Sequence, residues 1–125
     1  MRKVKGIIAL DLDGTLLNSA KELTEGNRRA LERAFEAGYA IVPTTGRFYG
    51  GMPQCIRDLP FVRYIITING AEVADLETGE VIYRAEIPNA LALAVYEAMD
   101  RENVLYDCYQ HNAAFMSVSH KARID

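Results

Sequence analysis

Two aspartates one residue apart, Asp11 and Asp13, are the residues of this chain best suited to chemistry. They follow an apolar run, Val4 to Leu10, that is typical of a buried parallel strand. Open α/β sheets bind their ligands at the carboxyl ends of such strands. Two carboxylates this close repel each other unless a cation or a shared proton relieves the repulsion. The pattern predicts a functional site at the end of the first strand, whereas a plain polar turn accounts only for the Asp-Gly pair.

Two later segments place polar residues in equivalent positions. Thr45, Gly46 and Arg47 directly follow the second expected strand, and Asn69 follows the third. Because the carboxyl ends of parallel strands share one edge of a sheet, these groups are expected to converge on the aspartates. There, one carboxylate can attack phosphorus, and a second can act as general acid and base. Mg²⁺ can hold carboxylate and phosphate together.

The elements that must position these residues follow from hydrophobic periodicity and from capping and turn residues. Their order, β-α-β with a further strand and a hairpin, predicts an α/β fold with a parallel sheet and a right-handed crossover. The expected strands are 4–10, 39–42, 64–67, 71–74, 80–85, 104–109 and 113–118, and the expected helices are 25–37, about 49–58, and one beginning near Pro88.

Three segments resemble a known family. Residues 11–18, Asp-Leu-Asp-Gly-Thr-Leu-Leu-Asn, resemble the first motif of the haloacid dehalogenase superfamily of phosphatases, and residues 45–47, Thr-Gly-Arg, resemble its second. Residues 69–71, Asn-Gly-Ala, are similar to a segment of the Cof-type, sugar-phosphatase-like branch. The resemblance implies an incomplete Rossmann-like core over residues 1–86, followed by the start of an α/β cap domain over 87–125.

The resemblance also implies roles for individual residues. Asp11 would be the nucleophile, forming an aspartyl-phosphate, and a ligand of Mg²⁺. Asp13 would be the general acid and base, and its backbone carbonyl would bind the same ion. The substrate would be a small phosphorylated metabolite such as a sugar phosphate. The residues implied to bind substrate or phosphate are Thr45, Gly46, Arg47 and Asn69.

This sequence departs from the family pattern in one respect. The family also uses a lysine in a third motif and a fourth motif of the form Gly-Asp-x-x-x-Asp, and neither occurs here. We therefore expect a truncated chain with weak Mg²⁺ binding and impaired turnover, since electrostatic stabilisation is often the largest catalytic contribution. The family's sheet has further strands beside the first one. Without them the first strand is expected to be an exposed edge, apolar on both faces and covered in a homo-oligomer.

The composition of the chain argues against some kinds of binding partner. Half of the 125 residues are hydrophobic, the formal net charge is −3 and no basic run occurs, which argues against a nucleic-acid partner. No apolar stretch is long enough to span a bilayer. Cys55 and Cys108 have no metal-binding or redox spacing, which favours a reducing, cytoplasmic setting. His111 and His120 lack metal-ligand partners at useful spacing and are expected at the surface or in loops.

Other interpretations stay open at this point. Thr45 can simply cap a helix beginning near Arg47, which is compatible with anion binding at that helix end. The chain can be a catalytically inactive remnant that binds a phosphorylated ligand, or only itself. A response-regulator receiver domain also phosphorylates an aspartate with Mg²⁺, but it needs its acceptor on a later strand and a lysine near the carboxyl end of the sheet.

Overall fold

The protein divides into two compact units, Met1–Arg84 and Ala85–Asp125. The structure, a computed structural model, describes residues 3–117, 119 and 120. The two units are described separately below. The assignment of the first to a catalytic core and of the second to a cap stays a prediction.

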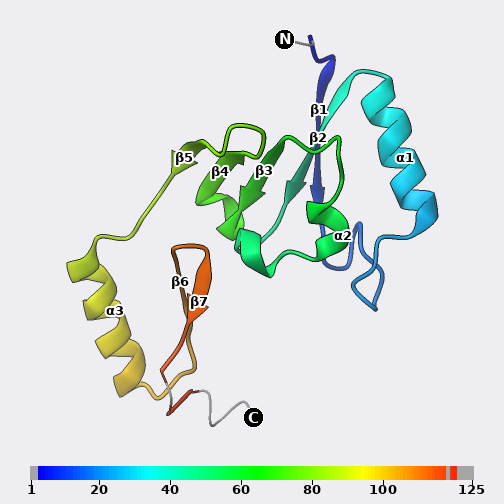
Figure 1. Ribbon diagram of the computed structural model, residues 1–125. Helices are drawn as coiled ribbons and strands as arrows, with labels where there is room; N and C mark the ends of the chain where they lie inside the picture. The colour runs from blue at the N-terminus through cyan, green and yellow to red at the C-terminus, as the bar shows by residue number, and fades with distance from the viewer. Residues whose placement is uncertain (1–2, 118, 121–125) are drawn as a thin grey trace. The chain divides into compact units, whose positions relative to one another are not determined.

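The first unit is built on one five-stranded sheet (Figure 1). The spatial order follows the chain, with β1–β2 and β2–β3 pairing in parallel and β3–β4 and β4–β5 antiparallel. The strands are β1 (Gly6–Asp11), β2 (Tyr39–Thr44), β3 (Tyr64–Thr67), β4 (Glu72–Asp75) and β5 (Val81–Arg84). Parallel strands with an intervening helix confirm the predicted Rossmann-like α/β class.

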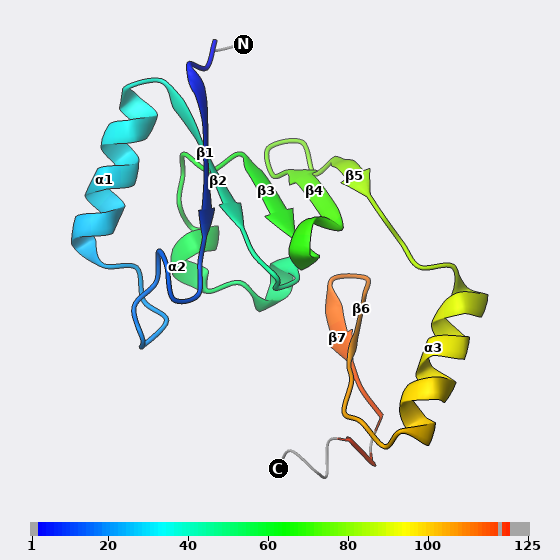
Figure 2. The same ribbon diagram turned by 180° about the vertical axis from the view of Figure 1, so that it is seen from behind.

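Helix α1 (Glu25–Glu36) connects β1 to β2 and lies beside that end of the sheet in both views (Figures 1 and 2). Thr24 caps it as expected, its hydroxyl oxygen accepting a hydrogen bond from the backbone N–H of Asn27 at 3.3 Å. Leu31 is the buried residue of the helix and packs into the core. The helix ends at Glu36, two residues before Gly38, so the boundaries predicted from sequence are nearly those observed.

The second predicted helix, 49–58, is wrong in length. A 3₁₀ turn, η1 (Tyr49–Gly51), is followed by a four-residue helix, α2 (Gln54–Arg57). Pro53 separates them, and it has no N–H with which to continue a helix. Ile56 of α2 nevertheless reaches the core, so this segment covers the sheet without forming a long helix.

The core cluster of the first unit packs against Ile8 and Leu10 on one side of β1. Leu12 is 0% exposed and sits directly between the two aspartates in sequence. The opposite side of β1 is open, with Ile7 69% exposed, so the expectation of a strand buried on both faces is wrong. β1 lies at the edge of the described sheet, as expected. The buried core residues are Leu12, Leu16, Leu17, Leu31, Ile41, Met52, Ile56, Leu59 and Ile65.

Thr67, at the end of β3, carries a buried hydroxyl with no hydrogen-bond partner among the described residues. Replacing it with Val keeps the shape and removes the unsatisfied group. We expect Thr67→Val to raise the free energy of unfolding by about 1 kcal/mol, measured by urea denaturation. Thr78→Val, at the β4–β5 turn, is the comparison, because the Thr78 hydroxyl accepts a hydrogen bond from the backbone N–H of Glu80. A destabilised Thr67→Val would mean that the hydroxyl has a partner in solution.

The second unit contains helix α3 (Asn89–Arg101) and an antiparallel hairpin of β6 (Cys108–Gln110) and β7 (Ala113–Phe115). Both hairpin strands are shorter than the predicted 104–109 and 113–118, and position 118 lies outside the described residues. No helix in the described part of the chain combines the length and apolar character needed to cross a bilayer.

His120 corrects another expectation. The sequence predicts it at the surface or in a loop, and the structure excludes the surface position, because the residue is only 6% exposed. Its ring packs edge-on against Tyr106, with ring centroids 4.7 Å apart. Tyr106 in turn stacks on Tyr96 at 5.1 Å. Sequence spacing could not reveal this contact, because it joins positions on different elements of the second unit.

Candidate active site

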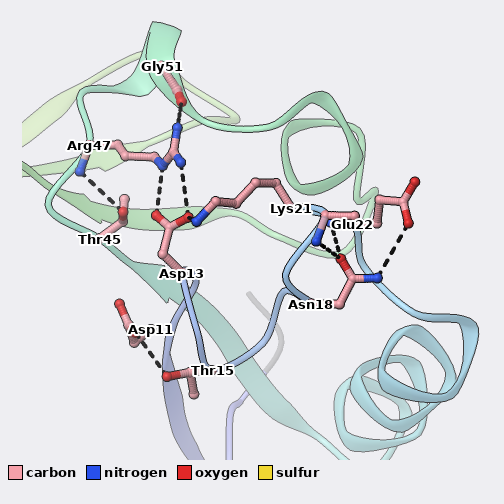
Figure 3. A network of polar contacts seen from close by, with 10 residues as sticks. Asp11, Asp13, Thr15, Asn18, Lys21, Glu22, Thr45, Arg47 and Gly51 are labelled. Carbon is pink, nitrogen blue, oxygen red and sulfur yellow. Dashed lines mark hydrogen bonds and ion pairs between the residues drawn. The ribbon is translucent and has the colours of Figure 1, made fainter.

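Strand register brings the first two polar segments to one edge of the sheet. Asp11, the last residue of β1, is paired with Thr44, the last residue of β2. Thr45 comes directly after that pair, and its backbone N–H donates to the carbonyl of Ile66 in β3 at 3.0 Å. Asp11 and Thr45 therefore leave adjacent strands in the same region (Figure 3). This is the convergence that the sequence predicts.

The turn after β1 separates the two aspartates around a buried residue. Leu12 points into the core, and the turn closes with a hydrogen bond from the N–H of Thr15 to the carbonyl of Leu12 at 3.3 Å. Gly14 has φ 76°, the left-handed region that glycine enters without strain. With Leu12 anchored inward, both Asp11 and Asp13 are left on the outside of the core.

Thr15 organises the carboxylate of Asp11. Its hydroxyl donates to Oδ2 of Asp11 at 2.9 Å (Figure 3). The hydrogen bond fixes the carboxylate and distinguishes its two oxygens, leaving Oδ1 as the atom without this donor. Sequence reasoning missed Thr15 as a site residue, and the available signal was a hydroxyl four positions after the first aspartate.

Asp13 is held by two cations from two different loops. Arg47 donates through Nε to Oδ2 at 2.7 Å and through Nη2 to Oδ1 at 2.9 Å, a bidentate pair. Lys21 donates through Nζ to Oδ1 at 2.9 Å. These hydrogen bonds, from Arg47 first and then Lys21, hold the pKa of the Asp13 carboxyl far below its ordinary value. Asp13 is therefore a carboxylate at neutral pH, and Lys21 is a site residue that the sequence analysis did not identify.

Further hydrogen bonds hold the side chain and the backbone of Arg47 in place. Its third guanidinium nitrogen, Nη1, donates to the carbonyl of Gly51 in η1 at 2.9 Å. Its backbone N–H donates to the hydroxyl oxygen of Thr45 at 3.2 Å. This contact is a local turn, so Thr45 does not cap a helix: the next α-helix begins only at Gln54. The helix-cap interpretation of Thr45 is wrong.

Asn69 lies close to Gly46 and is bonded to the backbone of Thr45. The N–H of Asn69 donates to the carbonyl of Thr45 at 3.1 Å. Asn69 has φ 54°, a conformation that asparagine tolerates better than most residues. A Cβ atom on Gly46 would lie 2.8 Å from Oδ1 of Asn69, so glycine allows this close approach. Thr45 itself is only 4% exposed, and its hydroxyl hydrogen has no acceptor among the described residues.

The residues present fit part of a Mg²⁺ site. Mg²⁺ prefers oxygen ligands and commonly takes one or two from the protein, with water and phosphate completing its shell. The carboxylate of Asp11 and the backbone carbonyl of Asp13 are oxygen donors of this kind. Within residues 3–117, 119 and 120, no group of three His, Cys, Asp or Glu side chains is placed to hold a metal. The chain's own donors are thus few.

Comparison with known proteins shows to which family this chain belongs. Residues 8–124 match the model of the haloacid dehalogenase-like hydrolase family, and the chain belongs to that family. Phosphatase YwpJ of Bacillus subtilis strain 168 is 29% identical over 119 residues, covering 95% of this chain. The chain spans 41% of YwpJ.

Two solved structures agree with this membership. A haloacid dehalogenase-like hydrolase from B. subtilis superposes with a TM-score of 0.80 at 28% identity, over 97% of this chain and 42% of its own. The subclass IIB sugar phosphatase BT4131 superposes with a TM-score of 0.75 at 25% identity, over 89% of this chain and 43% of its own. The similarity thus extends over both units, while this chain corresponds to less than half of either structure.

Proposed function

We propose that this chain carries the nucleophile and phosphate-binding part of a Mg²⁺-dependent phosphomonoester hydrolase. The observation that carries the proposal is the joint placement of Asp11, Thr45 and the Asp13–Arg47 pair at the ends of β1 and β2. The family membership supports the same reaction class. The proposed substrate is a small phosphorylated metabolite.

In the proposed reaction, an oxygen of Asp11 attacks phosphorus, and the bond from phosphorus to the ester oxygen breaks. The product alcohol leaves with a proton from Asp13, and Asp11 holds the phosphoryl group as an aspartyl-phosphate. Water then attacks that phosphorus, gives its proton to Asp13, and releases phosphate and free Asp11. Thr45 offers its O–H to a phosphoryl oxygen throughout.

The ion pairs of Asp13 with Arg47 and Lys21 affect both proton transfers of the proposed reaction. A carboxylate paired with Arg47 and Lys21 is ready to accept a proton from water, as the second step requires. Donation to an alkyl leaving group in the first step requires Asp13 to take up a proton beforehand, which the contacts with Arg47 and Lys21 disfavour. We therefore expect the phospho-enzyme to form faster with p-nitrophenyl phosphate, whose leaving group departs without a proton, than with alkyl phosphates.

Mg²⁺, when bound by Asp11 and the carbonyl of Asp13, would offset the repulsion between the carboxylate and the incoming phosphate. The test is release of p-nitrophenol from p-nitrophenyl phosphate by the full chain, with Mg²⁺ and with EDTA in its place. We expect slow turnover that EDTA abolishes and that Asp11→Asn removes. Turnover that survives both changes would reject the proposed site.

A second candidate is a non-catalytic phosphate-binding protein. Two observations favour it: the hydrogen bonds from Arg47 and Lys21 that lower the pKa of Asp13, and the few metal donors among the described residues. Calorimetry that shows binding of inorganic phosphate or vanadate by the chain, together with no p-nitrophenol release, would select this alternative.

The edge position of β1 supports one proposal about partners: a second copy of this chain pairs with that edge to form a homo-oligomer. Light scattering on the eluted protein is expected to give twice the 13.9 kDa chain mass or more. A monomer at micromolar concentration would reject the oligomer. A cytoplasmic location also stays a proposal, supported by the free thiols of Cys55 and Cys108.

A further inference from the structure

The loop between β1 and α1 contains a tight turn that carries Lys21. Asn18 closes it: its carbonyl accepts from the N–H of Lys21 at 3.0 Å, and its side-chain Oδ1 accepts from Ala20 and Glu22 at 3.0 and 2.9 Å. The N–H of Asn18 donates to the carbonyl of Glu22 at 3.0 Å. The turn is thus fixed at both ends by one residue, as Figure 3 shows.

This turn is attached firmly to the core. Leu17, 3% exposed, precedes it, and its N–H donates to the carbonyl of Leu12 at 2.9 Å. Leu17 and Leu23 form an antiparallel bridge across the base of the turn. The carbonyl of Leu16 accepts from Nδ2 of Asn27 in α1 at 2.9 Å. Lys21 therefore projects from a rigid support.

The support holds Lys21 in a conformation that is unfavourable for lysine. Its φ is 63°, in the left-handed region, which is unfavourable for a residue with a Cβ. The ion pair with Asp13 offsets this only weakly, because ion pairs open to solvent contribute little to stability. Stability alone does not explain why this turn aims a lysine at the site, and such uncompensated strain is typical of functional positions.

The position of the ammonium group indicates what it contacts. Nζ of Lys21 and Nη2 of Arg47 both lie 2.9 Å from Oδ1 of Asp13, the carboxylate proposed to face the leaving group. The Lys21 side chain is 54% exposed, whereas Arg47 is more enclosed and bound to Gly51 as well. Lys21 has three donors, so it can keep Asp13 and bind a second anion from the solvent side.

We propose that Lys21 is a specificity-determining residue that binds an anionic group, a carboxylate or a second phosphate, on the leaving-group portion of the substrate. This inference rests on the proposed function, because it takes the phosphoryl group to lie at Asp11 and Thr45. It narrows the substrate class to phosphomonoesters whose alcohol carries a negative charge close to the ester.

The test compares two phosphonates, which the proposed hydrolysis leaves intact. Propylphosphonate and 3-phosphonopropionate share the phosphonate group, and only the second carries a carboxylate. Calorimetry on the full chain with Mg²⁺ is expected to show the carboxylate compound binding about tenfold more tightly, as one charge-assisted contact provides. Lys21→Gln should abolish this preference and change propylphosphonate affinity by less than about twofold.

Three further variants sharpen the comparison. Lys21→Arg retains a cation and should keep the preference. Lys21→Asn removes the charge with a residue that accepts positive φ, so it separates charge from turn geometry if Lys21→Gln folds poorly. Arg29→Gln, which breaks an exposed ion pair with Glu25 on α1, is the matched control and should match the wild type.

The outcomes separate the inference from the function on which it rests. Equal weakening of both phosphonates in Lys21→Gln would show that Lys21 only positions Asp13, and would overturn the inference. A preference that survives in Lys21→Gln and Lys21→Asn would overturn it too. A wild-type chain that binds neither phosphonate would overturn the proposed phosphate site, and this inference with it.

Discussion

Asp11→Asn is expected to reduce hydrolysis of p-nitrophenyl phosphate at least about 1,000-fold, because loss of a nucleophile removes the covalent route altogether. Asparagine has nearly the same size as aspartate and can still accept the hydrogen bond from Thr15. Its amide oxygen, however, is a poor nucleophile and brings no negative charge for a metal. The variant should therefore keep the fold and the turn after β1 but lose hydrolysis.

The measurement is p-nitrophenol release at saturating Mg²⁺, with urea denaturation to verify folding. Asp107→Asn in the second unit is the matched control, since Asp107 is exposed and is not one of the proposed site residues. Activity of Asp11→Asn within tenfold of the wild type would contradict the nucleophile assignment. Loss of activity in both variants alike would show that the assay reports something other than this site.

Leu12→Ala is expected to lower the free energy of unfolding by about 3 kcal/mol, the central cost of truncating a fully buried leucine. Leu12 is 0% exposed and belongs to the core cluster. Its carbonyl also accepts from Thr15 and Leu17. Loss of the leucine side chain should therefore loosen the turn that places Asp11 and Asp13, as well as the core beneath it.

The urea midpoint should fall with little change in the slope of the unfolding transition. Ile7→Ala on the open side of β1 is the control, because Ile7 is largely exposed, and we expect a change within about 0.5 kcal/mol. Similar losses for both variants would mean that the open face of β1 is covered in solution. That result would contradict the exposure of Ile7 seen in the structure.

Local patterns determined the elements near the site. An apolar run before Asp11, a threonine cap before α1 and a glycine after it are signals carried by neighbouring residues, and they predicted β1, α1 and β2 to within a few positions. The prediction of the second helix is wrong for a local reason as well. A helix over 49–58 is expected from the sequence, but Pro53 has no N–H with which to continue one, so a 3₁₀ turn and a four-residue helix form instead.

The sequence by itself determined which residues converge, since residues at the ends of parallel strands must share an edge. Only the tertiary structure decided how they are paired. Arg47 reaches Asp13 across 34 positions, and Lys21 reaches it from a turn that Asn18 closes. Such contacts depend on strand register and on the direction of long side chains, which spacing along the chain does not encode. The sequence therefore indicated a phosphate site, and the fold added the cations that surround its second carboxylate.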